Sequence, residues 1–191
     1  MTVRRTPVTL RVMRASMAGG IALGADVAFF FSAIKLTTVA NATVIGALQP
    51  VVVAITANRF FGETIRRRDI VLGLVAIVGV VVVVLAAASD APSDWRGDAL
   101  AVGALFSWSA YFIFARQAKG VITSNEYTVG AAIWVAIINA PLAVLFGQSM
   151  AWPSLGNWFW ILVMAFGAGI LGHAAMNWSL QQIPLWLGST F

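Results

Sequence analysis

Two ionisable side chains stand inside long apolar runs of this sequence. Asp26 lies within the run 15–34, and His173 lies within the run 157–182. A charge at the centre of a membrane helix costs about 2.5–3.5 kcal/mol on insertion scales, so such groups face a cavity or a partner. Asp26 suits the binding of a proton or a cation. The alternative interpretation is a carboxylate that hydrogen-bonds a neighbouring helix.

His173 is the single histidine of the chain, and Asn177 follows it at i+4. This spacing places both side chains on one face of a helix. An unperturbed imidazole exchanges its proton near pH 6.5, which suits a proton pathway. The alternative is a histidine whose hydrogen bonds serve helix packing. A metal site is disfavoured because the chain has no second imidazole and no thiol.

Amides accompany a proline in the uncharged run from Leu36 to Asn58. Asn41 and Gln49 lie two turns apart, and Pro50 follows directly. Proline removes a backbone donor and bends a helix, which a membrane tolerates only beside protein or cavity water. The sequence therefore predicts that this bend faces a polar cavity, where the amides bind a solute. Hydrogen bonding between helices is the alternative for both amides.

Trp108 and Tyr111 lie one turn apart in a later apolar run. Aromatic rings in a cavity can stack on a solute or hold a cation. Packing between helices, or anchoring at the membrane interface, is the favoured alternative for this pair.

A Gly-Glu pair, Gly62 and Glu63, ends the proline-containing run beside Arg66, Arg67 and Arg68. A carboxylate at the carboxyl end of a helix opposes the helix dipole, so Glu63 needs cationic partners. We expect the arginines to supply them and the group to hold a loop or a gate.

The composition is that of a polytopic membrane protein. Of 191 residues, 60% are hydrophobic and 10% are charged, whereas soluble domains carry about 25% charged residues. The basic residues lie in short loops, which argues against nucleic-acid binding despite a pI near 10.8. The chain has no cysteine nucleophile and no Walker-type phosphate loop, so we predict neither an enzyme nor a bound cofactor.

Six apolar segments follow one another with short separators, and a seventh begins near Pro184. We place them at 15–34, 37–58, 70–88, 98–116, 126–147 and 157–182. The small residues Gly73, Gly79 and Gly167 would allow close helix packing. The fold class is therefore all-α, a transmembrane helical bundle of six full helices and the start of a seventh.

Loop charges predict the orientation of the bundle. With the N-terminus inside, the inner segments hold ten Lys and Arg residues and the outer loops hold two. The positive-inside rule then places the N-terminus in the cytoplasm and the chain in the cell membrane.

A faint repeat relates residues 17–44 to residues 164–191 and aligns Asp26 with His173. By the loop charges the two copies run in opposite directions across the membrane. Inverted repeats of this kind are common in secondary transporters.

Three stretches resemble the EamA-type group of the drug/metabolite transporter superfamily. They read ANATVIGALQPVVVAITANRFFGE, GLVAIVGVVVVVL and GDALAVGALFSWSAYFIFARQ, and the sharpest matches are Pro50, Gly62 and Glu63. The resemblance implies two inverted repeats of five helices, of which this chain would hold the third to the eighth helix and the start of the ninth. Residues 1–88 would then end the first repeat, and residues 89–191 would begin the second, with the architecture truncated at both ends.

Together these observations predict a secondary transporter, an exporter of small metabolites or drugs that works by alternating access. Its partners would be the lipid bilayer, a small solute and a coupling proton or ion. A second copy of the chain or a polypeptide supplying the missing helices would be its protein partner. The alternative is a non-transporting membrane subunit or a defective fragment of such a transporter.

Overall fold

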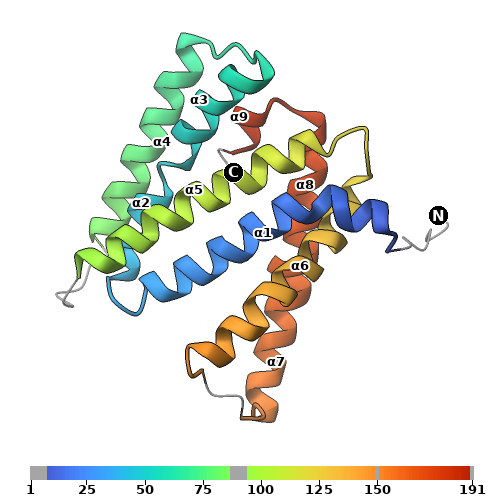
Figure 1. Ribbon diagram of the computed structural model, residues 1–191. Helices are drawn as coiled ribbons and strands as arrows, with labels where there is room; N and C mark the ends of the chain where they lie inside the picture. The colour runs from blue at the N-terminus through green and yellow to red at the C-terminus, as the bar shows by residue number, and fades with distance from the viewer. Residues whose placement is uncertain (1–7, 87–93, 149–150, 190–191) are drawn as a thin grey trace.

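The computed structural model describes residues 8–86, 94–148 and 151–189, and every regular element in these ranges is a helix (Figure 1). The elements are α1 (Leu10–Ala33), α2 (Val39–Gly46), α3 (Gln49–Phe61), α4 (Arg67–Ala86), α5 (Trp95–Gln117), α6 (Ser124–Leu145), α7 (Leu155–Met164), the π-helix η1 (Ala165–Gly172), α8 (His173–Gln182) and α9 (Leu185–Gly188).

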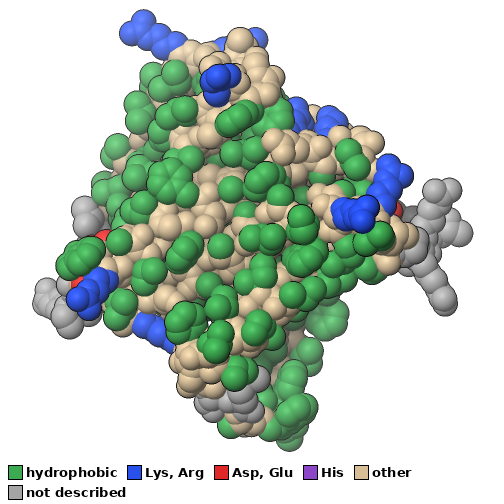
Figure 2. All heavy atoms as spheres, viewed as in Figure 1, with side chains coloured by type: hydrophobic (Ala, Val, Ile, Leu, Met, Phe, Trp, Pro, Cys, Tyr) green, Lys and Arg blue, Asp and Glu red, His purple; other side chains and the backbone are tan. Residues whose placement is uncertain are grey.

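Five helical stretches are long and apolar enough to cross a membrane. They are Leu10–Ala33, Val39–Phe61, Trp95–Gln117, Ser124–Leu145 and Leu155–Gln182, and α4 adds the shorter apolar stretch Ile70–Val82. Hydrophobic side chains spread over the face seen in Figure 2, while Lys and Arg side chains sit around its edges. The prediction of an all-α polytopic membrane bundle is confirmed.

The first helix begins earlier than its apolar run. We predicted a start at residue 15, but α1 starts at Leu10, because the Thr9 hydroxyl accepts a hydrogen bond from the Val12 N–H (3.3 Å) and caps the helix. Arginine is a good helix former, so Arg11 and Arg14 extend the helix beyond its apolar part.

The bend expected at Pro50 is a break between two helices. α2 ends at Gly46, and the Leu48 N–H bonds the Ile45 carbonyl three residues back (3.1 Å) before α3 begins at Gln49. Since Pro50 has no N–H, the Gly46 carbonyl loses its usual helical donor. The helical hydrogen bonding is thereby interrupted within the apolar stretch Val39–Phe61.

The core lies where α1 packs between α5 and α6, which run beside it in Figure 1. Gly19 and Gly20 make this approach possible: a Cβ atom at either position would overlap Tyr127 or Trp134 of α6. The Trp134 indole N–H also donates to the Met13 carbonyl of α1 (2.9 Å). Close packing thus fixes the helix that carries Asp26.

The glycines that we expected to allow close helix packing do not lie at close helix contacts in the described structure. A Cβ atom at Gly73, Gly79 or Gly167 would meet nothing within 4 Å in the described structure. That prediction is wrong, because no other helix approaches these glycines closely; Gly73 faces α3 across a groove.

Candidate functional site

A cavity of about 510 Å³ opens among α1, α2, α3, α4 and α5. Asp26, Gln49 and Trp108, each from a different helix and each predicted from the sequence, line it together. The rest of its wall is mostly apolar and small, with Phe30, Ala42, Thr43, Ala47, Ala101 and Ala104 among the lining residues. A volume of this size suits a small organic molecule.

The cavity has a single acidic group in its described lining. Among the described residues that line it there is no Lys or Arg, and Asp26 is its one ionisable side chain. Gln49 is 8% exposed, and its Nε2 donates to no described group. Buried polar atoms are normally paired with protein or water, so this amide has a hydrogen bond to offer inside the cavity. The site therefore carries a carboxylate, a free amide donor and an aromatic face.

Behind Trp108 lies a buried polar cluster centred on Asn177. The Asn177 Nδ2 donates to the Tyr111 hydroxyl (2.7 Å) and to the Thr128 hydroxyl (2.9 Å). The Tyr127 hydroxyl donates to the Tyr111 carbonyl (3.1 Å). These bonds tie α5, α6 and α8 together and hold the Tyr111 side chain, which is fully buried.

His173 joins this cluster through its ring. Its ring centroid lies 5.7 Å from that of Trp108 and 5.9 Å from that of Tyr111, with both neighbours edge-on. His173 Nδ1 and Asn177 Oδ1 have no hydrogen-bond partner among the described residues. His173 directly follows the π-helix η1, and π-helical segments occur frequently at functional sites.

The predicted residues therefore fall into two adjoining groups. Asp26 and Gln49 line the cavity, Tyr111 and Asn177 lie in the polar cluster, and Trp108 belongs to both. No pattern in the sequence indicated Thr128 or Tyr127 as members, since a hydroxyl one turn into an apolar helix is common in packing.

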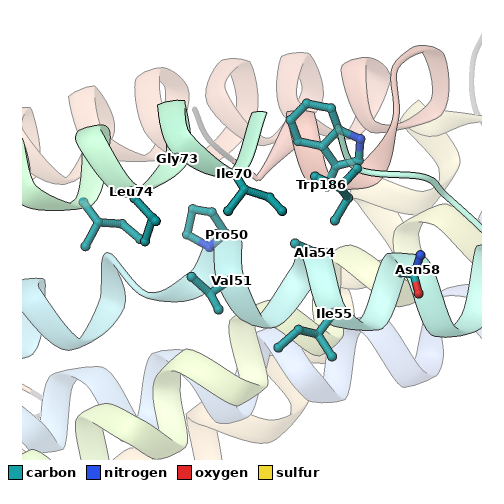
Figure 3. A pocket seen from close by; sticks show the side chains of 11 residues that line it. Pro50, Val51, Ala54, Ile55, Asn58, Ile70, Gly73, Leu74 and Trp186 are labelled. Carbon is teal, nitrogen blue, oxygen red and sulfur yellow. The ribbon is translucent and has the colours of Figure 1, made fainter. Parts of the chain in front are cut away.

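Pro50 adjoins the cavity instead of lining it. Together with Gln49 it lines a smaller hollow of about 180 Å³ toward α4. A second groove of about 520 Å³ separates α3 from α4, with Pro50, Val51 and Ile55 on one side and Trp186 of α9 beside it (Figure 3). This groove is apolar, with the Asn58 amide as a polar group at one end.

Asn41 is placed away from the cavity lining. Its Nδ2 donates to the Thr37 hydroxyl (3.2 Å) and lies 3.4 Å from the Asp98 carboxylate of α5. Its amide therefore joins the start of α2 to the start of α5. The contacts of Asn41 agree with the alternative interpretation, which was hydrogen bonding between helices.

Gly62 and Glu63 form the end of α3. Gly62 has a φ of 63°, the left-handed conformation that ends helices and favours glycine, and the Glu63 N–H then bonds the Ala57 carbonyl (3.3 Å). Glu63 is thereby turned away from α3. Its carboxylate accepts from the Leu185 N–H at the start of α9, at 2.8 and 3.0 Å from its two oxygens.

The ion pair of Glu63 is formed with Arg116 of α5 (3.4 Å) and not with Arg66, Arg67 or Arg68 as we expected. The reason is geometric: the left-handed Gly62 directs the carboxylate toward α5 and α9, whereas the arginine cluster begins α4. The signal for Arg116 in the sequence was weak, a single arginine at the end of an apolar run.

Among the described residues, no three side chains of the kinds that hold metal ions come together.

Residues 4–85 match the model of the EamA-like transporter family. This part of the chain is similar to that family. A curated protein similar to the chain, the aromatic amino acid exporter YddG of Ancylobacter novellus, is 30% identical over 155 residues, which cover 80% of this chain and 52% of the relative. The chain thus spans about half the length of this curated relative.

A solved structure, described as "Crystal structure of protein", is similar in fold to this chain. The TM-score is 0.74 at 26% sequence identity, and the match covers 100% of this chain and 64% of the other. The matching family is described as transporters, and the curated relative is described as an exporter.

Proposed function

We propose that this chain exports a small organic solute across the cell membrane, with the cavity around Asp26 as its binding site. The observation that carries the proposal is the convergence of a carboxylate, an amide and an indole from α1, α3 and α5 in one cavity of about 510 Å³. Three helices that cross the membrane thus contribute one polar group each to a shared hollow.

An aromatic amino acid is the substrate class we propose to test first. The curated relative is named as an exporter of such compounds. Asp26 offers a partner for an ammonium group, and the Trp108 face offers a surface for an aromatic ring. The small side chains Ala42, Ala101 and Ala104 leave room beside them.

Transport would proceed by alternating access, with Asp26 or His173 binding a coupling proton. Support comes from their position: both lie within membrane-spanning stretches, and Trp108 contacts the His173 ring while lining the cavity with Asp26. The N-terminus would be cytoplasmic, as the excess of basic residues in alternate loops indicates.

The test is efflux of radiolabelled phenylalanine, tyrosine and tryptophan from proteoliposomes that contain the purified chain, at external pH values from 5.5 to 8. We expect efflux from loaded vesicles and a dependence on pH that Asp26→Asn abolishes. The matched control is Glu126→Gln, an equal loss of charge at the start of α6, where the carboxylate bonds within its own turn. If efflux by the Asp26→Asn variant still depends on pH, the proposed role of Asp26 is overturned.

A non-transporting subunit is the second candidate function, and the observation favouring it is that the chain covers 52% of its curated relative. It predicts that the chain alone is inactive in the same vesicles. Co-reconstitution with the parts of the relative that the match does not cover would then restore efflux, whereas a self-sufficient chain transports without them.

A further inference from the structure

The Glu63 carboxylate holds the start of α9. Besides the two contacts with the Leu185 N–H, one of its oxygens lies 3.5 Å from the Trp186 N–H. The Glu63 side chain is 11% exposed. A carboxylate that is largely shielded from water and accepts backbone N–H groups forms strong, charge-assisted hydrogen bonds.

Arg116 completes this contact from the end of α5. Its Nη1 donates to the Leu180 carbonyl (2.9 Å) and the Ile183 carbonyl (3.3 Å), both near the end of α8, while its Nη2 pairs with Glu63. One ion pair therefore fastens α3, α5, α8 and α9 to each other. We call these contacts of Glu63 and Arg116 the Glu63 clasp.

A second acid holds the start of α2 at the other end of α5. The Asp98 carboxylate accepts from the Thr37 hydroxyl (2.6 Å) and from Asn41 (3.4 Å). The Asp94 N–H donates to the Leu36 carbonyl (2.9 Å) and reinforces the contact. We call these contacts the Asp98 clasp.

The two clasps lie at opposite ends of one helix. Asp98 and Arg116 are eighteen residues apart on α5, which is about 27 Å along the helix axis. Each clasp holds the start of a short helix. α2 has eight residues and supplies Ala42, Thr43 and Gly46 to the cavity wall, and Ala47 follows it there. α9 has four residues, and Trp186 and Ser189 at α9 line the hollows beside Pro50.

We propose that the Glu63 clasp and the Asp98 clasp are the two gates of the transport cycle, each closing the Asp26 cavity toward one face of the membrane. The contacts of both clasps are formed in this structure. Release of the Asp98 clasp frees α2 to swing about the Pro50 break, and release of the Glu63 clasp frees α9 and the adjoining end of α3. The inference rests on the proposed transport function and names the residues that control access.

The experiment measures access to the cavity from each face and requires no transport. The chain has no native cysteine, so Ala47→Cys, in the cavity wall, is a single reporter for a membrane-impermeant maleimide. Labelling is compared in whole cells and in inside-out vesicles. We expect Glu63→Gln to raise labelling about fivefold or more from one face, and Asp98→Asn to do so from the opposite face.

Three further variants separate gating from loss of structure. Glu126→Gln should leave labelling from both faces unchanged. Glu63→Asp keeps the charge on a shorter side chain and should raise labelling less than Glu63→Gln. If the Glu63→Gln protein does not accumulate in cells, labelling of the Glu63→Asp protein replaces it as the test. Arg116→Lys keeps a cation but loses the fork, of which Nη1 reaches the two carbonyls and Nη2 reaches Glu63. It should therefore open the same face as Glu63→Gln.

Two results would overturn the proposal. In the first, labelling rises equally from both faces; in the second, labelling is unchanged in both Glu63→Gln and Asp98→Asn. Efflux measured on the same variants keeps the two hypotheses apart. Side-selective labelling without any solute efflux supports the clasps and refutes the proposed function. Solute efflux without side-selective labelling supports the proposed function and refutes the clasps as gates.

Discussion

The indole of Trp108 meets the imidazole of His173 edge-on, with ring centroids 5.7 Å apart and planes at 81°. Trp108 also stacks on Tyr111 at 5.5 Å and lines the cavity that contains Asp26. One side chain of α5 therefore separates the cavity from the buried polar cluster and contacts both. Movement of the Trp108 ring would therefore change the surroundings of both Asp26 and His173.

Replacement of Trp108 tests whether this position serves the solute. Trp108→Ala removes the aromatic face of the cavity, and we expect efflux to fall about tenfold or more, which corresponds to about 1.4 kcal/mol of lost stabilisation. Trp108→Phe keeps a ring at the same place and should retain most of the activity. Equal efflux in the wild type and Trp108→Ala would assign the indole to packing alone.

The bond between Asn177 and Tyr111 should contribute to stability as part of a network. Asn177→Ala leaves the Tyr111 and Thr128 hydroxyls without their donor, at an expected cost of about 1–3 kcal/mol. Tyr111→Phe removes the partner, so the double variant should cost less than the sum of the two single changes. Unfolding of the purified variants in detergent, followed by circular dichroism, measures all three; strict additivity would mean that the bond contributes nothing.

Two glycines form a matched pair for the packing of α1. Gly19→Ala places a methyl group against the fully buried Tyr127, whose hydroxyl is already engaged, and should destabilise the protein by about 1–3 kcal/mol. Gly73→Ala, on α4, meets open space and should be neutral or stabilise by up to about 1 kcal/mol through helix propensity. The same unfolding assay ranks them, and the reverse order would contradict the close approach of α1 to α6.

The orientation of the chain is testable with two further cysteines. Arg67→Cys lies at the start of α4, and Pro92→Cys lies outside the described residues. In whole cells we expect an impermeant maleimide to label position 92 and not position 67. Inside-out vesicles should give the opposite result, and labelling of position 67 in whole cells would place the N-terminus outside.

The sequence determined the membrane bundle, the break at Pro50 and the residue types of the site. Apolar runs of membrane length leave helices as the natural solution, because every backbone group must be paired within the bilayer. Pro50 lacks the N–H that a continuous helix needs, so the sequence predicted a bend there, although Pro141 lies inside α6 without ending it. Asp26 and His173 stood out because an ionisable group within an apolar run needs a polar environment.

Tertiary structure alone decided which of these residues meet. Helical spacing placed Asn41 and Gln49 on one face, yet the break before Pro50 separates them: Gln49 lines the cavity, while Asn41 lies with Asp98. The partner of Glu63 is 53 residues away in the chain, and a left-handed glycine aims the carboxylate at it. Such contacts depend on how the helices cross, and the crossing is set by close approaches such as that of Gly19 to Tyr127, which no local pattern reveals.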